Sequence, residues 1–125
     1  MKNKTMTIPK SHFKIFKHEV ERLIDVLGLK EWNVEIAFEE FGTSESCPNA
    51  EIKWNSKSRC VKFRYNRKII DAHRKMIIPP LICAKHEIGH LLMAEMEEIA
   101  TARYVADYEV DAASEKFATL ISKVL

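Results

Sequence analysis

The chain has 125 residues, of which 46% are apolar and 30% are charged, and its formal net charge is +2 at pH 7. This length predicts one domain, residues 1–125, with a single core, and the near balance of charge gives no general attraction to nucleic acid or membranes. No apolar run approaches the about 20 residues of a membrane span or forms a signal peptide, and three cysteines without Cys-x-x-Cys spacing suit reduced thiols, so a cytoplasmic protein is expected.

The first third of the chain predicts a loose polar terminus at residues 1–7, a helix and a strand. Apolar residues recur at the spacing of an amphipathic helix from Phe13 to Leu27, and Gly28 is expected to close that helix. Residues 32–38 then alternate between large apolar and polar or small side chains. This period of two is typical of a strand with one buried face.

A β-hairpin is expected after the polar stretch at residues 42–48. Residues 52–54 and 61–65 alternate in the same way around a turn at residues 55–58. With residues 32–38 they predict three antiparallel strands, and a further short strand or turn is expected around Ile69 and Ile70. A helix, strands and then further helices predict an α+β fold, with a three- to four-stranded, mostly antiparallel sheet behind an active-site helix.

The segment from Lys53 to Lys75 is strongly basic and contains a single acid, Asp71. Lys62 and Arg64 project from the face of their strand opposite to its apolar and aromatic residues. A nucleic-acid site would place aromatic and basic side chains on the same face, so a solvated basic face is favoured. Selection of acidic protein substrates and docking on DNA are the alternatives.

A partly buried helix is predicted from about Leu81, because prolines such as Pro79 and Pro80 suit the first turn of a helix. An apolar stripe follows, at Leu81, Ala84, Ile88, Leu91 and Leu92, widened by Ile82 and Met93. Gly89 costs about 1 kcal/mol relative to alanine inside a helix. Close approach of another backbone segment would explain a glycine at that position.

This helix carries the most informative stretch of the chain, His86-Glu87-Ile88-Gly89-His90. Residues four apart lie on one helical face, so both imidazoles can reach one metal ion. Glu87 lies to one side, where it can contact a water on the metal without binding the metal. The spacing is that of a zinc hydrolase, and the alternative is a surface helix with two solvated histidines and a glutamate.

A catalytic zinc needs a third protein ligand and keeps one position for water. A second apolar stripe runs through residues 110–124 and marks the buried side of a C-terminal helix. Glu109 lies at the edge of this stripe and is the predicted ligand, whereas Asp111 points away and is the reserve. Cys83 precedes His86 by three residues, so helical phase would also allow it to bind zinc. Its apolar neighbours instead favour a small buried thiol.

His-Glu-x-x-His on one helix with a glutamate on the next resembles the gluzincin zinc metallopeptidases, and is most similar to the single-domain minigluzincins and to anti-repressor-type peptidases. The resemblance covers about residue 32 to the C-terminus. It implies a minimal zincin-like catalytic domain with a C-terminal ligand-bearing helix and a sheet edge that holds substrate as an added strand. Ala113 stands where the family often has an Asp or Asn that supports a zinc-bound histidine, so that role would be absent or fall to Asp107 or Asp111.

The predicted function is that of a zinc metalloendopeptidase acting on a protein or peptide. Zn²⁺ held by His86, His90 and Glu109 would lower the pKa of a bound water toward ~7, and Glu87 would take its proton and pass it to the leaving amine. Tyr108 is the first candidate for a donor to the oxyanion. The other candidates, in order of preference, are Tyr104, Arg103 and His73.

Two other classes of function stay open at this point. A zinc-dependent regulator with weak or highly selective proteolysis would fit the departure from the family pattern at Ala113. A nucleic-acid-associated module would use the basic hairpin and keep the metal for structure, but a structural zinc normally has four protein ligands. No membrane partner is expected, and the sequence leaves open whether the chain associates with itself.

Overall fold

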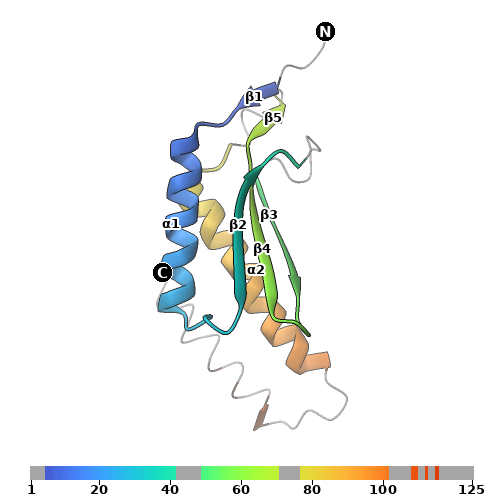
Figure 1. Cartoon of the computed structure of the whole chain (residues 1–125). Helices are drawn as coiled ribbons and strands as arrows, with labels where there is room; N and C mark the ends of the chain where they lie inside the picture. The colour runs from blue at the N-terminus through green and yellow to red at the C-terminus, as the bar shows by residue number, and fades with distance from the viewer. Residues whose placement is uncertain are drawn as a thin grey trace.

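A computed structural model describes residues 5–41, 49–70 and 77–101, together with residues 108, 109, 112 and 115. In these ranges the chain forms a small α+β domain with two helices and a mixed sheet, which confirms the predicted class at this level (Figure 1). The elements are, in order, β1 (Thr5–Thr7), α1 (Lys10–Val26), β2 (Asn33–Glu39), β3 (Ala50–Asn55), β4 (Cys60–Asn66), β5 (Lys68–Ile70) and α2 (Pro80–Thr101).

Helix α1 follows its predicted pattern closely. Its apolar positions every three or four residues are buried at Phe16, Val20 and Leu23. The helix ends before Gly28, whose φ of +68° lies in the left-handed region that L side chains rarely adopt, so the predicted stop is confirmed. Leu29 N–H then donates to the Ile24 carbonyl at 2.9 Å and turns the chain toward β2.

The three-stranded sheet has the order β2-β4-β3. Strands β3 and β4 form the predicted antiparallel hairpin, with Ala50 opposite Tyr65 and Asn55 opposite Cys60. Strand β2 pairs with β4 in parallel, so the prediction of three antiparallel strands is wrong for β2. Alternation specifies that a strand has a buried face, but it does not specify the direction of the strand that will lie beside it.

The N-terminal segment is more ordered than its polar composition predicts. Residues 5–7 form β1, which pairs antiparallel with β5, and Ile8 N–H continues the pairing by donating to the Arg67 carbonyl at 2.8 Å. The prediction of a loose terminus is therefore wrong for residues 5–7, whereas the short strand expected around Ile69 and Ile70 is confirmed. The partner of β1 lies more than 60 residues away in the sequence, so local composition does not reveal it.

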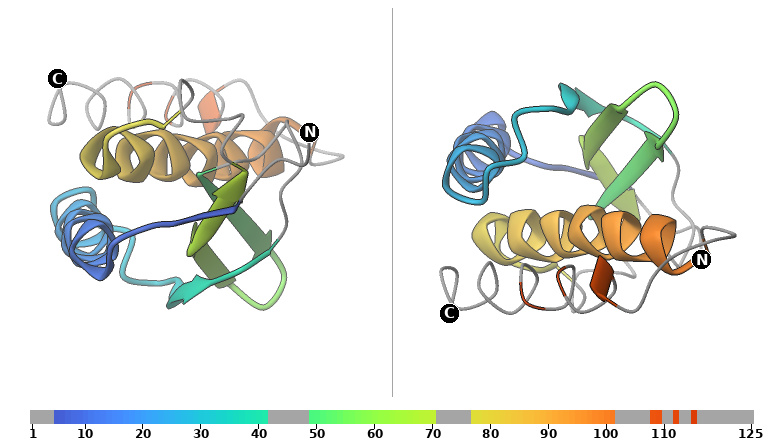
Figure 2. Two further views of the ribbon diagram at one scale, coloured as in Figure 1. Left: turned by 90° about the horizontal axis from the view of Figure 1, so that it is seen from above. Right: turned by 90° about the horizontal axis from the view of Figure 1, so that it is seen from below.

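Both helices pack on one face of the sheet, as the two views of Figure 2 show. Strand β4 is central and turns Val61, Phe63 and Tyr65 toward the helices, where all three are buried. The rings of Tyr65 and Phe16 on α1 are 4.8 Å apart between centroids. The core thus joins β4 to α1 and α2, and it fixes the position of α2 beneath the hairpin.

Helix α2 is buried along one narrow stripe. Ala84, Ile88 and Leu91 are buried, as predicted, because they face the sheet and α1. The prediction is wrong for Leu81, which was expected within the stripe, and for Ile82 and Met93, which were expected to widen it, because all three are exposed. Within the described residues, no helix combines the length and the apolar character that a bilayer crossing requires.

Candidate functional site

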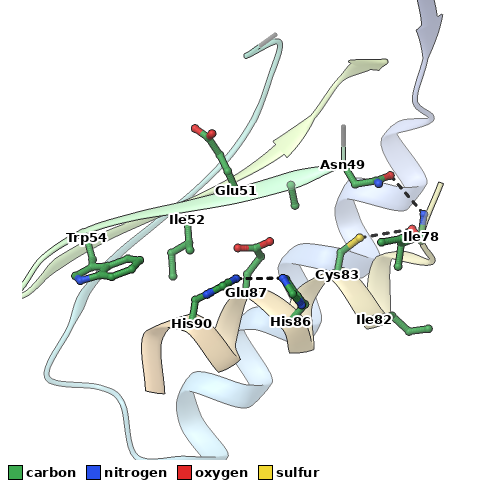
Figure 3. Close-up of a pocket in the computed structure, with 11 residues that line it drawn as sticks. Asn49, Glu51, Ile52, Trp54, Ile78, Ile82, Cys83, His86, Glu87 and His90 are labelled. Atoms are coloured by element: carbon green, nitrogen blue, oxygen red, sulfur yellow. Dashed lines mark hydrogen bonds between the residues drawn. The ribbon is translucent and has the colours of Figure 1, made fainter. Parts of the chain in front are cut away.

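The helical phase of α2 places the histidine motif beside β3, with Glu87 buried and both imidazoles exposed. The first turn forms as expected after the prolines, with Cys83 N–H donating to the Pro79 carbonyl at 3.1 Å. His86 and His90 lie at the edge of the buried stripe and line one cleft with Ile52 and Trp54 of β3 (Figure 3). No described atom comes within 4 Å of a Cβ built on Gly89, so the close backbone approach expected there is not found among the described residues.

His86 and His90 lie side by side, with their Nε2 atoms 3.1 Å apart and their rings edge to face. Two imidazole nitrogens bound to one tetrahedral zinc at about 2.0–2.1 Å would be about 3.3 Å apart. The pair therefore needs only a small rotation of either ring to fit such an ion. Both rings are exposed to solvent, so an ion could reach them.

Glu87 is the most unusual side chain of the site, because it is a carboxylic acid with only 6% of its surface exposed. Figure 3 shows its carboxylate next to the histidine pair, on the side facing β3. Burial raises the pKa of Glu87 to about 7, and the negative charge of Glu51 adds to the effect. A carboxyl group with a pKa near neutrality can both accept and release a proton at pH 7.

A cleft of about 520 Å³ runs between β3 and α2 above these three residues. On the strand side its wall is built by the inward positions Ala50, Ile52 and Trp54, because alternate residues of a strand face the same way. Ile78 and Ile82 line the helix side toward one end. Large apolar side chains here remain open to solvent, with Trp54 40% and Ile82 54% exposed.

Cys83 also lines the cleft, but its thiol points away from the histidines (Figure 3). Its Sγ donates to the Ile78 carbonyl at 3.5 Å, and burial raises the pKa of this thiol to about 11. A protonated, hydrogen-bonded thiol is a poor zinc ligand, since the metal binds the thiolate. The geometry therefore agrees with the interpretation of Cys83 as a small buried thiol.

The third metal ligand is not assembled by the described residues. Glu109 and Tyr108 both have helical backbone and exposed side chains, and Tyr108 is 73% exposed. No group of three His, Cys, Asp or Glu side chains in the described ranges is arranged to hold an ion. Glu109 as ligand and Tyr108 as oxyanion donor thus stay predictions. The remaining candidates lie outside the described residues, namely Asp107, Asp111, Arg103, Tyr104 and His73, as does Ala113, where the chain departs from the family pattern.

The basic hairpin carries less free charge than its sequence suggests. On the outer face of the sheet, Arg64 pairs with both Glu39, at 2.7 Å, and Glu51, and Lys62 lies 3.1 Å from Glu39. These cations come from β4, and the acids come from the strands on either side of it. The pairing favours a charged outer surface without an assembled phosphate-binding site, in line with the solvated-face interpretation.

Glu51, Ile52, Trp54 and Asn49 line the cleft but were not singled out as site residues from sequence. The alternation of Ile52 and Trp54 indicates that they share a face, but only the packing of the hairpin over α2 shows that this face opposes His86 and His90. Comparison with protein-family models, curated proteins and solved structures finds no match for this chain.

Proposed function

We propose that the protein is a zinc-dependent peptidase that hydrolyses peptide bonds in the cleft between β3 and α2. One observation carries the proposal: a buried carboxyl group, with its pKa raised to about 7, lies on the same stretch of α2 as two histidines whose Nε2 atoms are 3.1 Å apart, and all three line one cleft. A paired set of imidazoles suits a metal, and a carboxyl poised near neutral pH suits general acid–base work.

His86 and His90 would hold the zinc ion, with Glu109 as the proposed third ligand. When bound, zinc would act as a Lewis acid toward water and the peptide carbonyl. Glu87 accepts the proton of the attacking water on a carboxylate oxygen and then delivers it to the nitrogen of the leaving amine. Its burial favours the neutral form, which keeps its pKa close to that needed for both transfers.

The substrate is proposed to be an extended peptide, bound as an added strand. Among the described strands β3 is hydrogen-bonded only to β4, so its other edge offers backbone donors and acceptors to a peptide. Ile52 and Trp54 would contact alternate side chains of that peptide, and Ile82 would contact side chains near the opposite end of the cleft. Apolar side chains are therefore expected in the part of the substrate that faces α2.

The proposal is tested by zinc titration together with cleavage of a diverse peptide library. The unmodified protein should bind about one zinc and cleave peptides. Glu87→Gln should bind zinc with similar affinity but lose about 10²–10⁴-fold in kcat, because the proton acceptor is removed while the histidines remain. Glu97→Gln, on the same helix but beyond the cleft, is the matched control and should retain activity.

Cleavage by Glu87→Gln at the rate of the unmodified protein would contradict the mechanism. Failure of the unmodified protein to bind zinc would contradict the site. Zinc binding without cleavage of any library peptide would instead favour the zinc-dependent regulator with highly selective proteolysis, which could then be tested on single protein substrates.

A further inference from the structure

The two walls of the cleft belong to separate elements, β3 and α2, so contacts between these elements must set the width of the cleft. Among the described strands β3 lies at the edge of the sheet, and side chains of β3 and α2 line the cleft between them. At the first end of β3, the Asn49 side-chain oxygen accepts a hydrogen bond from Ile78 N–H at 3.4 Å, just before α2 begins. The other end is the turn that leads into β4.

Arg59, the last residue of that turn, contacts two other parts of the molecule through its side chain. Its guanidinium carbon lies 5.0 Å from the centroid of the Trp32 ring, within the range of a cation–π interaction. Its Nη2 atom lies 3.3 Å from a carboxylate oxygen of Glu98 on α2. The side chain thus reaches from the tip of the hairpin to the helix that carries His90.

Trp32 is the common support of this arrangement. It is buried, and its indole N–H donates to the Glu95 carboxylate on α2 at 3.1 Å. Glu95 and Glu98 follow His90 by five and eight residues on the same helix. Arg59 and Trp32 therefore connect the hairpin to α2 within about two helical turns of His90. Trp54 lines the end of the cleft on this side.

The backbone of Arg59 shows that this position is constrained by its surroundings. Its φ of 55° lies in the left-handed region, which a glycine would adopt with less strain. Its carbonyl accepts a hydrogen bond of 2.7 Å from Asn33 N–H, at the start of β2. A glycine here would keep the backbone hydrogen bond but would lose both contacts of the guanidinium. The turn itself does not require an arginine, so the side chain matters through its contacts with Trp32 and Glu98.

We infer that Arg59 is a positioning residue that holds the β3 wall of the cleft at its working distance from His86 and His90. The inference rests on the proposed peptidase function, because it assigns Arg59 a role in substrate binding. A peptide paired with β3 would make its backbone contacts in the ground state and in the transition state alike. Loosening β3 should therefore weaken binding and raise KM more than it lowers kcat.

Arg59→Met tests the inference, since it keeps much of the side-chain length but removes the charge and the planar group. On the best-cleaved library peptide, KM should rise by roughly tenfold with kcat within about twofold, and zinc affinity should not change. Arg59→Lys, which retains a cation over Trp32, should restore part of the loss. Lys57→Met removes a charge from the same turn without a contact to Trp32 or Glu98, and it should behave like the unmodified protein.

Hydrogen exchange of the metal-free variants provides a readout that needs no activity. Arg59→Met should speed exchange in the β3–β4 hairpin while leaving α1 unchanged, and Lys57→Met should leave exchange unchanged in both. The inference would be overturned if Arg59→Met left hydrogen exchange and KM unchanged. It would also be overturned if Arg59→Met lowered zinc affinity and kcat by the same factor. If the unmodified protein cleaves nothing, the proposed function fails, and faster exchange confined to the hairpin would then establish Arg59 only as the anchor of β3.

Discussion

The two walls of the cleft are built in different ways. The α2 wall is a helix fixed by a buried stripe, and it carries every ionisable group to which the proposed chemistry is assigned within the cleft: His86, Glu87 and His90. The β3 wall is an edge strand with mainly apolar inward residues, joined to the rest of the protein through β4 and through contacts at its two ends. Under the proposed function the two walls would divide chemistry from substrate recognition, so substitutions on them should have different consequences.

The largest effect is expected on the α2 wall, for His90→Ala. Removing one of three proposed protein ligands should lower zinc affinity by about a thousandfold and abolish peptide cleavage. The thermal midpoint of the metal-free protein should change little, because the His90 ring is exposed and contacts His86. Zinc titration with a competing chelator measures the affinity, and His18→Ala, an exposed histidine on α1, is the control. Undiminished zinc binding by His90→Ala would show that the metal site lies elsewhere.

A smaller and different effect is expected on the β3 wall, for Trp54→Ala. The indole is 40% exposed at the cleft, so its removal should cost little stability but should take away apolar contact with a bound peptide. KM should rise by about three- to tenfold, while zinc affinity and kcat change little. Lys53→Ala, the neighbouring residue on the opposite face of β3, should leave KM unchanged. A fall in kcat with unchanged KM would mean that the two walls do not divide their tasks in this way.

The same contrast explains which features the sequence could predict. The α2 wall is encoded locally, because the four-residue spacing of His86 and His90 and the period of the buried stripe require only that the segment be helical. The hairpin was predictable for the same reason, since its two alternating segments flank one turn. The parallel pairing of β2, and the partnership of β1 with β5, depend on contacts between distant segments and left no local signal.

The candidate site shows the same limit in its chemistry. The roles of His86, Glu87 and His90 could be proposed from spacing, but the burial that raises the pKa of Glu87 comes from the sheet packed above it. Arg59 and Trp32 are 27 residues apart in the sequence, and their side chains come together only through the fold. Glu109 as a ligand remains a prediction. Helical phase indicates on which side of its helix Glu109 lies, but it does not give the distance between Glu109 and α2.

The smallest effect concerns α1, which supports the α2 wall from behind. Glu19 is buried on α1, and its hydrogen bonds from Arg22, the nearer at 2.6 Å, lower the pKa of its carboxyl below the ordinary value of 4.5, with Lys85 on α2 adding to the shift. A lowered folded-state pKa means that the stabilising contribution is present above the unfolded pKa. It is lost as pH falls through the folded-state value.

Glu19→Gln should therefore destabilise the metal-free protein at pH 7 by up to about 1 kcal/mol, a modest amount because solvent screens the half-exposed Arg22. Urea unfolding at a series of pH values measures the difference, which should shrink below about pH 4 as the carboxylate of the unmodified protein is protonated. Glu21→Gln, an exposed neighbour on α1, is the control. A difference that stays constant down to pH 3 would show that Glu19 supports the helix through packing rather than charge, and α2 would then owe its position to the apolar stripe alone.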